Sequence, residues 1–444
     1  MKNVLWTMAV SAGFILASCE RPDTMEREAL FPETPKEDLQ PPSDSPDSTL
    51  VMALLQLGLP VVWIQTTDSE EPSYELSDPP EGCLGGSIKN ATKVSGRVVV
   101  EDQHSIIYDS GDYVAKQSGM TVKVRGNWSA RRPKKPYKLK LQSKGDMLGR
   151  GDKRFNSKNW LLLPFFDMNS YIGLYVNELL ALQWTPRFQY VNVVFNGDYR
   201  GLYMLMEAVE RNADCRLDVD KETGYIVELD AYWWNEERYV LASFDEPLNY
   251  TFKYPDEDDL TQEQADYIQG VLTDAENATR DGTYPEKIDV ESFARWMLAH
   301  DILGNADGAG SNMYLTKYDN STASLLMMGC LWDFDAIMQS EEWDEIHGRY
   351  FFKGLFASDN RSFVQQYVHL WRTKGRLAFD SLERCLDDYL ASELRHAVDA
   401  SIEKNNGRWA SEMHDLPSSA VFVEQAKTYF SRRKDWLEER ILEL

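Results

Sequence analysis

The spacing of apolar residues changes near Asp256, and this change limits the folds open to the chain. Before it, short runs such as residues 96–101 and 137–141 alternate or are rich in β-branched residues, and glycine and proline separate them, which indicates strands. After it, apolar residues recur at helical spacing. We therefore expect an α+β fold with a β-rich part over residues 49–255 and a mainly helical part over residues 256–444.

Local signals predict how parts of this fold begin and end. Asn196-Gly197 separates two apolar runs and predicts a hairpin in an antiparallel sheet. Asp289 is predicted to cap a helix that ends at Gly304, so that the residues after it enter a loop. Residues 59–64 are predicted to be the buried strand that opens the folded part, because the apolar run around them is too short to span a bilayer.

Two acidic segments follow apolar elements: Asp307-Gly308-Ala309-Gly310-Ser311-Asn312 and Trp332-Asp333-Phe334-Asp335. Asp307 precedes Asn312 by the spacing that separates a catalytic Asp from a metal-binding Asn in protein kinases, and Asp333 has the place of their second metal ligand. Asp333 and Asp335 would point the same way on an extended segment. Carboxylate and amide oxygens suit Mg²⁺. The alternative is that these residues form ordinary turns.

A basic segment interrupts an otherwise acidic chain. From Lys123 to Lys144 the sequence contains nine lysines and arginines and no aspartate or glutamate. This local excess suggests a site for an anion such as phosphate. The alternative is a solvated loop followed by an edge strand that its lysines protect. On a strand, Lys138 and Lys140 would face a ligand while Leu139 faces the core.

The order of several motifs resembles the spore-coat CotH kinase family. The blocks are Val124-Arg125-Gly126-Asn127-Trp128, Lys134-Lys135-Pro136-Tyr137-Lys138-Leu139-Lys140-Leu141, Lys158-Asn159-Trp160-Leu161-Leu162-Leu163, Asn196-Gly197-Asp198-Tyr199-Arg200-Gly201-Leu202-Tyr203 with Glu207, Gly224-Tyr225-Ile226-Val227-Glu228-Leu229-Asp230, Gly304-Asn305-Ala306-Asp307 and Trp332-Asp333-Phe334-Asp335. The resemblance covers about residues 58–340 well and the rest loosely. It implies an atypical protein-kinase-like bilobal fold that uses ATP and Mg²⁺, with Mn²⁺ as an alternative.

The resemblance implies roles for the acidic residues. Asp307 would orient or deprotonate the acceptor hydroxyl of a serine or threonine. Asn312 and Asp333 would hold the metal, with Asp335 as a further ligand. The acceptor would be an exported protein.

The resemblance also implies a phosphate-binding pair. Lys140 and Glu207 would fix the phosphates as the lysine and glutamate of kinases do, and Arg125 and Lys138 would add charge at the nucleotide. Family members often carry a lysine after the glutamate, whereas Ala208 stands here.

The N-terminus is predicted to be a targeting segment. Residues 1–18 have the form of a lipoprotein signal peptide, and Leu16-Ala17-Ser18-Cys19 resembles a lipoprotein cleavage box with Cys19 as the lipidated residue. Residues 19–48 are rich in proline and acidic residues and are predicted to be a disordered tether. We expect a cell-envelope protein anchored by its lipid to the outer membrane. The alternative is a simple secretory peptide.

The other cysteines match no metal or tight disulfide pattern: Cys83, Cys215, Cys330 and Cys385. Export permits disulfides, and four thiols allow three pairings. Cys330 lies in an apolar segment and is predicted to be a buried thiol.

The formal net charge of −25 argues against nucleic acid as a partner. Residues 361–444 show helical spacing without a chemical motif. Arg432, Arg433 and Lys434 within them are interpreted as solvated charges.

Three functions fit these patterns. The first is an exported kinase that transfers phosphate from ATP to serine or threonine. The second is a non-catalytic envelope protein on a kinase-like frame that recognises a surface protein or glycan. The third is a metal-dependent hydrolase that uses Asp333 and Asp335, although no histidine cluster accompanies them.

Overall fold

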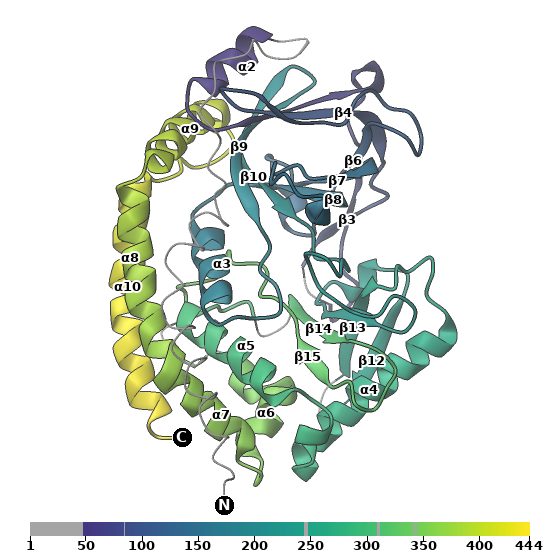
Figure 1. Cartoon of the computed structure of the whole chain (residues 1–444), viewed down its shortest axis with the longest axis vertical. Coiled ribbons are helices and arrows are strands. Elements are labelled where there is room, and N and C mark those ends of the chain that lie inside the picture. The colour runs from purple at the N-terminus through teal and green to yellow at the C-terminus, as the bar shows by residue number, and fades with distance from the viewer. Residues whose placement is uncertain (1–47, 84, 244–246, 309–310, 341, 344) are drawn as a thin grey trace, which may run out of the picture.

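The computed structural model describes residues 48–83, 85–243, 247–308, 311–340, 342–343 and 345–444. It is a mixed α+β structure with a β-rich N-terminal half and a mainly helical C-terminal part, as the spacing of apolar residues predicts (Figure 1). The predicted signal peptide, Cys19 and nearly all of the predicted tether lie outside the described residues.

Seven strands close into a barrel at one end of the molecule (Figure 1). In spatial order they are β1 (Val61–Thr66), β9 (Phe188–Phe195), β10 (Asp198–Glu207), β8 (Ser157–Pro164), β7 (Tyr137–Gly145), β6 (Met120–Val124) and β4 (Val94–Glu101). β1 closes the ring because it pairs antiparallel with β4 and parallel with β9. This parallel pair departs from the antiparallel sheet that we expected.

Smaller elements complete this half. Helix α2 (Ser48–Leu55) packs against β1, β5 (Ile106–Asp109) extends the sheet at β4, and β2 (Glu75–Ser77) pairs with β3 (Ser87–Lys89). Short 3₁₀ helices span Thr67–Ser69, Ser129–Arg131 and Lys153–Phe155.

The two faces of the barrel wall differ in chemistry. Leu139 and Leu141 of β7 are buried in the barrel core, whereas Lys138 is half-buried and Lys140 exposed on the outer face. This confirms the alternation expected for β7. The predicted hairpin joins β9 and β10, where Asn196 and Gly197 both have positive φ, at 49° and 79°, as a tight hairpin turn requires.

A second, five-stranded antiparallel sheet lies beside the helices. Its order is β12 (Tyr239–Ser243), β13 (Pro247–Tyr254), β11 (Tyr225–Leu229), β14 (Met313–Lys317) and β15 (Leu326–Met328). It takes strands from both sides of residue 256. Helix α4 (Gln262–Asp281) packs against β12. Strands β14 and β15 form a hairpin before the second acidic segment, and β15 ends at Met328.

The remaining helices make up most of the C-terminal part, together with one helix from the N-terminal half (Figure 1). They are α3 (Asn169–Leu179), α5 (Val290–Leu303), α6 (Tyr350–Ala357), α7 (Ser362–Leu370), α8 (Arg376–Leu390), α9 (Glu393–Trp409) and α10 (Ser419–Ile441), with 3₁₀ helices at Trp233–Asn235, Tyr284–Glu286 and Glu345–Gly348 and a π-helical turn at Trp371–Gly375. Helix α3 is the one from the N-terminal half, and it packs against α5 and α8. The caps predicted for α5 are present. The Asp289 carboxylate accepts from the Ser292 N–H, and Gly304 ends the helix with φ 54°.

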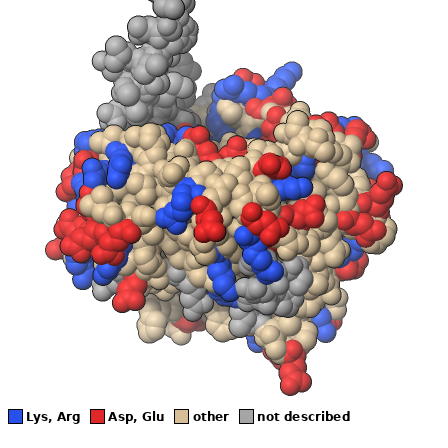
Figure 2. Space-filling view, turned by 90° about the horizontal axis from the view of Figure 1, so that it is seen from below, with Lys and Arg blue, Asp and Glu red and all other residues tan. Residues whose placement is uncertain are grey.

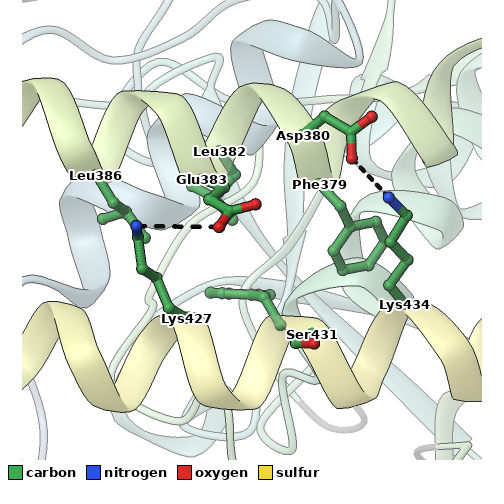
Figure 3. A pocket seen from close by; sticks show the side chains of 9 residues that line it. Phe379, Asp380, Leu382, Glu383, Leu386, Lys427, Ser431 and Lys434 are labelled. Carbon is green, nitrogen blue, oxygen red and sulfur yellow. Dashed lines mark hydrogen bonds and ion pairs between the residues drawn. The ribbon is translucent and has the colours of Figure 1, made fainter.

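Helices α8 and α10 run side by side, and a shallow pocket lies between them (Figure 3). Its apolar lining includes Phe379 and Leu386. The dashed lines in Figure 3 mark ion pairs that connect the two helices, one of them joining Lys434 to Asp380 at 2.5 Å.

The interpretation of residues 432–434 as solvated charges is wrong for Arg433. Its side chain is 2% exposed, and its guanidinium donates to the carbonyl oxygens of Asp301 and Glu342 at 2.7 and 2.9 Å. An arginine that satisfies buried carbonyls is indistinguishable in sequence from one in water, because its stem packs like an apolar residue.

Cys330 is buried, as predicted, and burial raises the pKa of its thiol. All four cysteines of the described chain are free thiols.

In the described part of the chain, no helix has both the length and the apolar character needed to cross a bilayer. Figure 2 shows one end of the molecule, where clusters of acidic side chains alternate with separate basic ones.

A buried lysine fastens the barrel to the C-terminal helices. The Lys134 ammonium is inaccessible to solvent and donates to the carbonyl oxygens of Phe165 and Leu202 at 3.1 and 2.6 Å and to Asn405 Oδ1 of α9 at 2.8 Å. Its charge also lies 5.0 Å from the ring centre of Tyr203. Three oxygens and a ring face therefore replace the hydration of this cation.

We expect Lys134→Met to lower the free energy of unfolding by about 2–4 kcal/mol, because the three acceptors would lose their buried donor. Urea unfolding followed by circular dichroism measures this change. Lys140→Met is the matched control, since Lys140 is exposed; its effect should stay within about 0.5 kcal/mol. Equal stability of the two variants would contradict this role.

Candidate functional site

Three aspartates from two separate loops converge. Asp307 follows α5, while Asp333 and Asp335 follow β15. One carboxylate oxygen from each lies within 4.8 Å of the others, and all three side chains remain accessible to solvent. The structure thus brings together the two acidic segments that the sequence singles out. Three converging carboxylates form a donor set that suits a hard divalent cation.

Asn305 connects the two loops. Its side chain is 2% exposed; Nδ2 donates to the Asp333 carbonyl oxygen at 3.3 Å, and Oδ1 accepts from the Asp307 N–H at 3.1 Å. A backbone hydrogen bond from Ala306 to Ala336 reinforces the connection. A single buried amide therefore fixes the backbone of two of the three aspartates.

Asn312 lies beside the cluster, where its Nδ2 donates to Asp307 Oδ2 at 3.4 Å. Asn312 itself has φ 63°. The predicted pair of Asp307 and Asn312 is therefore in contact.

The expectation of an extended segment at Asp333 is wrong. Asp333 has φ 57°, in the left-handed region that costs a non-glycine residue about 1 kcal/mol or more. The carboxylates of Asp333 and Asp335 converge because the chain turns there, and not because a strand places alternate residues on one face. Strain of this kind is concentrated at functional sites.

The cluster has altered proton affinity. Burial by the surrounding protein, with the nearby charges of Asp335 and Asp307, raises the pKa of Asp333 to about 7. Although the carboxylate is accessible to water, enough protein surrounds it to weaken its solvation. Burial and the charge of Asp335 also raise the pKa of Asp307. A divalent cation would relieve this repulsion.

Cations gather on the outer face of the barrel, and one of them, Arg125, lies near the cluster. Lys123 of β6 stands directly across from Lys138 of β7, and Arg125 follows on the same face. Burial and the charge of Lys123 lower the pKa of Lys138 to about 8. The charge of Arg125 acts on Asp333, which shows that this arginine lies near the acidic cluster. Among described residues, none of these three side chains has an ion-pair partner within 4.0 Å.

The second sheet faces these cations with a mixed polar surface. Lys253 of β13 pairs with Glu228 of β11 at 2.7 Å. Burial and the charge of Glu228 raise the pKa of Asp230 to about 7. The charge of Lys253 also lowers the pKa of Lys138, so the two sheets approach one another here.

Lys140 and Glu207 are not brought together. Lys140 is opposite Asn159, whereas Glu207 is opposite Trp160, the neighbouring position. Directly paired residues share a face of a sheet, so this register places Glu207 on the face opposite Lys140. The expected ion pair between them is therefore wrong.

Glu207 is fully buried among other partners. Oε1 accepts from Arg150 Nη1 at 2.9 Å, and Oε2 accepts from the Arg187 N–H at 3.0 Å. Arg216 lies 3.9 Å from the same carboxylate. Glu207 thus belongs to an arginine network within the barrel.

Sequence reasoning missed Asn305 and Lys123 as members of this region. Asn305 stands two residues before Asp307 in a recognised motif. The sequence gives this position, but it does not show that the side chain bonds to the backbone of Asp307 and Asp333. Lys123 was one of nine basic residues, and only the pairing of β6 with β7 selects it. The pocket between α8 and α10 includes none of the predicted site residues in its lining.

Comparison with protein families matches residues 122–441 to the family described as CotH kinase protein. The match runs from β6 to the end of α10, so it includes the C-terminal helices that the motifs cover only loosely. No curated protein sequence matches the chain significantly.

Among solved structures, a chain in the Shewanella oneidensis MR-1 complex of the toxin–antitoxin proteins HipA and HipB with operator DNA matches with 13% identity and a TM-score of 0.27. The alignment covers 65% of this chain and 62% of that chain, which is less than two thirds of its length. At this TM-score the likeness carries no conclusion about this chain.

Asp333→Asn should stabilise the metal-free protein at pH 8 by about 1 kcal/mol, with allowance for solvent screening. Since the pKa of Asp333 is raised from 3.8 to about 7 in the folded protein, its ionisation opposes folding above pH 7 and this penalty is absent below pH 3.8. The gain should therefore shrink as pH falls from 7 towards 4. Urea unfolding at several pH values measures it, and a gain independent of pH would contradict the assignment.

Asn305→Ala should weaken Mn²⁺ binding about tenfold or more, because residues that orient metal ligands typically contribute that much. Isothermal titration calorimetry measures the dissociation constant. Asn320→Ala, an exposed position in the β14–β15 turn, is the control and should bind Mn²⁺ like the unmodified protein. Unchanged affinity in Asn305→Ala would remove Asn305 from the site.

Proposed function

This chain belongs to the CotH kinase protein family, and from that premise we propose that it transfers the terminal phosphate of ATP to a serine or threonine of an exported protein. The observation that carries the proposal is the arrangement of charge. Three converging carboxylates lie near Arg125, which shares the outer face of the barrel with Lys123 and Lys138, and none of these three cations has an ion-pair partner within 4.0 Å among the described residues. Such a site attracts a cation and a polyanion together. A metal–nucleotide complex is a pair of this kind.

The acidic cluster has the donors for Mg²⁺ or Mn²⁺. Asp333, Asp335 and the Asn312 side chain would hold it, and the bound ion supplies charge neutralisation for the phosphates. Asp307 orients the acceptor hydroxyl and accepts its proton as the hydroxyl oxygen bonds to phosphorus and the bond to ADP breaks. The raised pKa of Asp307 favours this proton transfer.

Lys123, Arg125 and Lys138 would bind the phosphates. Two lysines directly opposite one another on neighbouring strands repel, so their presence costs stability unless an anion binds between them. Lys140 lies on the same outer face and adds to the attraction of an anion. Glu207 supports the site indirectly, because it fixes Arg150 inside the barrel wall.

In this proposal the barrel and the helical part act as the two lobes of a kinase-like fold. The predicted signal peptide and lipidation at Cys19 would place the enzyme in the cell envelope, attached to the outer membrane. Its acceptor would be another exported protein.

A specific observation favours a second function. The Lys–Glu pair expected for kinases is absent between Lys140 and Glu207, and Ala208 stands where members of the family often carry a lysine. A protein that binds nucleotide and metal without phosphate transfer, and that recognises an envelope protein or glycan, fits this departure.

Thermal shift with ATP, in the presence and absence of Mg²⁺ or Mn²⁺, tests the shared premise of both functions. A metal-dependent stabilisation that Asp333→Ala removes would support a nucleotide site, and incorporation of labelled phosphate into protein would then separate the kinase from the binding protein. If millimolar ATP and metal produced no shift, the kinase proposal would be rejected.

Lys123→Met should raise the stability of the ligand-free protein by about 0.5–1 kcal/mol and weaken ATP binding about tenfold. The first effect follows from removing a half-buried like-charge pair, and the second from removing a phosphate contact. Chemical unfolding and calorimetric titration measure the two effects. Lys144→Met, exposed at the end of β7, is the control for ATP binding. Full ATP affinity in Lys123→Met would show that Lys123 does not contact the phosphates.

A further inference from the structure

One face of helix α3 follows the second acidic segment. Helix α3 lies between β8 and β9 in the chain, so that both of its ends lead into barrel strands, and it packs against α5 and α8 (Figure 1). Asn169, Gly173 and Asn177 are spaced by four residues, which places them one above another on one side of the helix. We call these three residues the α3 stripe. Each of them contacts a different part of residues 331–335.

Asn177 holds the start of this segment. Its side chain is fully buried, and its Oδ1 accepts from the Leu331 N–H at 2.7 Å. Its Nδ2 donates to the Trp184 carbonyl oxygen at 3.0 Å and to Thr185 Oγ1 at 2.6 Å. Because both ends of the amide are bonded, its orientation is fixed. The backbone two residues before Asp333 is thereby attached to α3.

Gly173 makes room for the ring of Phe334. A Cβ atom built on Gly173 would lie 2.0 Å from the nearest ring carbon, and the ring itself is buried. Carbon atoms that are not bonded pack about 3.5–4.0 Å apart, so that any larger residue at this position must displace the ring. Phe334 stands between Asp333 and Asp335 in the chain. The seat of its ring on α3 therefore affects where both carboxylates lie.

Asn169 holds the end of the segment. Its side chain is buried, and its Nδ2 donates to the Asp335 carbonyl oxygen at 3.5 Å. Gln339 Nε2 donates to the same oxygen at 3.3 Å from the exposed side. The chain on both sides of Asp333 is thus bonded to a single helix, which lies outside the two loops that carry the acidic cluster.

We propose that the α3 stripe positions the carboxylates of Asp333 and Asp335 for their metal ion. This inference rests on the metal site of the proposed function and adds three positioning residues to it, which act through the backbone and the ring of residues 331–335. Because α3 leads into barrel strands at both ends, the stripe also fixes the acidic cluster relative to the barrel that carries the cations.

Gly173→Ala tests the stripe, because its added Cβ must displace the Phe334 ring and with it the residues on either side. The variant should bind Mn²⁺ about tenfold or more weakly, as is typical when residues that orient metal ligands are changed. Calorimetric titration of Mn²⁺ alone into the full chain measures the dissociation constant, at a temperature at which circular dichroism shows each variant to be folded.

A second substitution separates positioning from general damage. Phe334→Leu in the Gly173→Ala protein removes the ring that the new Cβ would meet, so that most of the lost Mn²⁺ affinity should return. Gly354→Ala is the matched control. Its Cβ would lie 1.9 Å from Thr279 Oγ1, where α6 packs against α4, so that the crowding is similar but does not involve the acidic segments. This control should bind Mn²⁺ like the unmodified protein.

The other outcomes are distinct. Unchanged Mn²⁺ affinity in folded Gly173→Ala, or a loss that Phe334→Leu does not reverse, would overturn the inference while the proposed metal site stands. If Gly173→Ala does not fold, Asn169→Ala decides: it should lose about threefold in affinity, less than is typical for such residues because Gln339 keeps one donor, and full affinity would overturn the inference. Failure of the unmodified protein to bind Mn²⁺ would reject the proposed metal site, and the inference with it.

Discussion

Hydrogen bonds between the loop after α5 and the loop after β15 hold the three mutually repelling carboxylates together. Asn305 donates to the Asp333 carbonyl oxygen and accepts from the Asp307 N–H, and Ala306 adds a backbone hydrogen bond to Ala336. The amide is held in turn by the left-handed end of α5 at Gly304. Rigid elements thus carry the geometry, while the loops carry the chemistry. The left-handed backbone at Asp333 has the same origin, because its carbonyl oxygen is fixed by Asn305 and the chain must turn to bring its side chain inward.

The barrel wall separates two uses of charge. On its inner side, Glu207 is satisfied by Arg150, by a backbone N–H and by the nearby Arg216, so that this buried charge is neutralised within the fold. On its outer side, Lys123 and Lys138 face one another, and among the described residues neither has an ion-pair partner within 4.0 Å. The first arrangement is a structural network, and the second is a surface suited to binding an anion. A kinase-like pairing of lysine and glutamate would have required both residues on one face.

Much of the local structure follows from sequence, and the partners of its side chains do not. The alternation in β7, the Asn196-Gly197 turn and the caps of α5 at Asp289 and Gly304 are local signals, and each was predicted. The meeting of Asp307 with Asp333 was inferred from motif order and family resemblance. Periodicity gives the face of a residue but not the register of distant strands, which is why the pairing of Lys140 with Glu207 was wrong. For the same reason the closure of the barrel by β1 is not predicted. The buried contacts of Arg433 are missed because a buried arginine cannot be told from a solvated one in sequence.

Strand β1, which closes the barrel, lies outside the residues that match the family. The family match begins at residue 122, whereas β1 and β4 precede it in sequence and complete the ring between β6 and β9. A polypeptide trimmed to the matched residues would leave β9 and the remaining residues of β6 without their barrel partners, and open strand edges of this kind can pair with other chains. The segment before the match therefore covers strand edges that would otherwise be exposed. The pairing of β1 with β9 joins residues more than a hundred positions apart, so that closure of the barrel depends on distant parts of the chain.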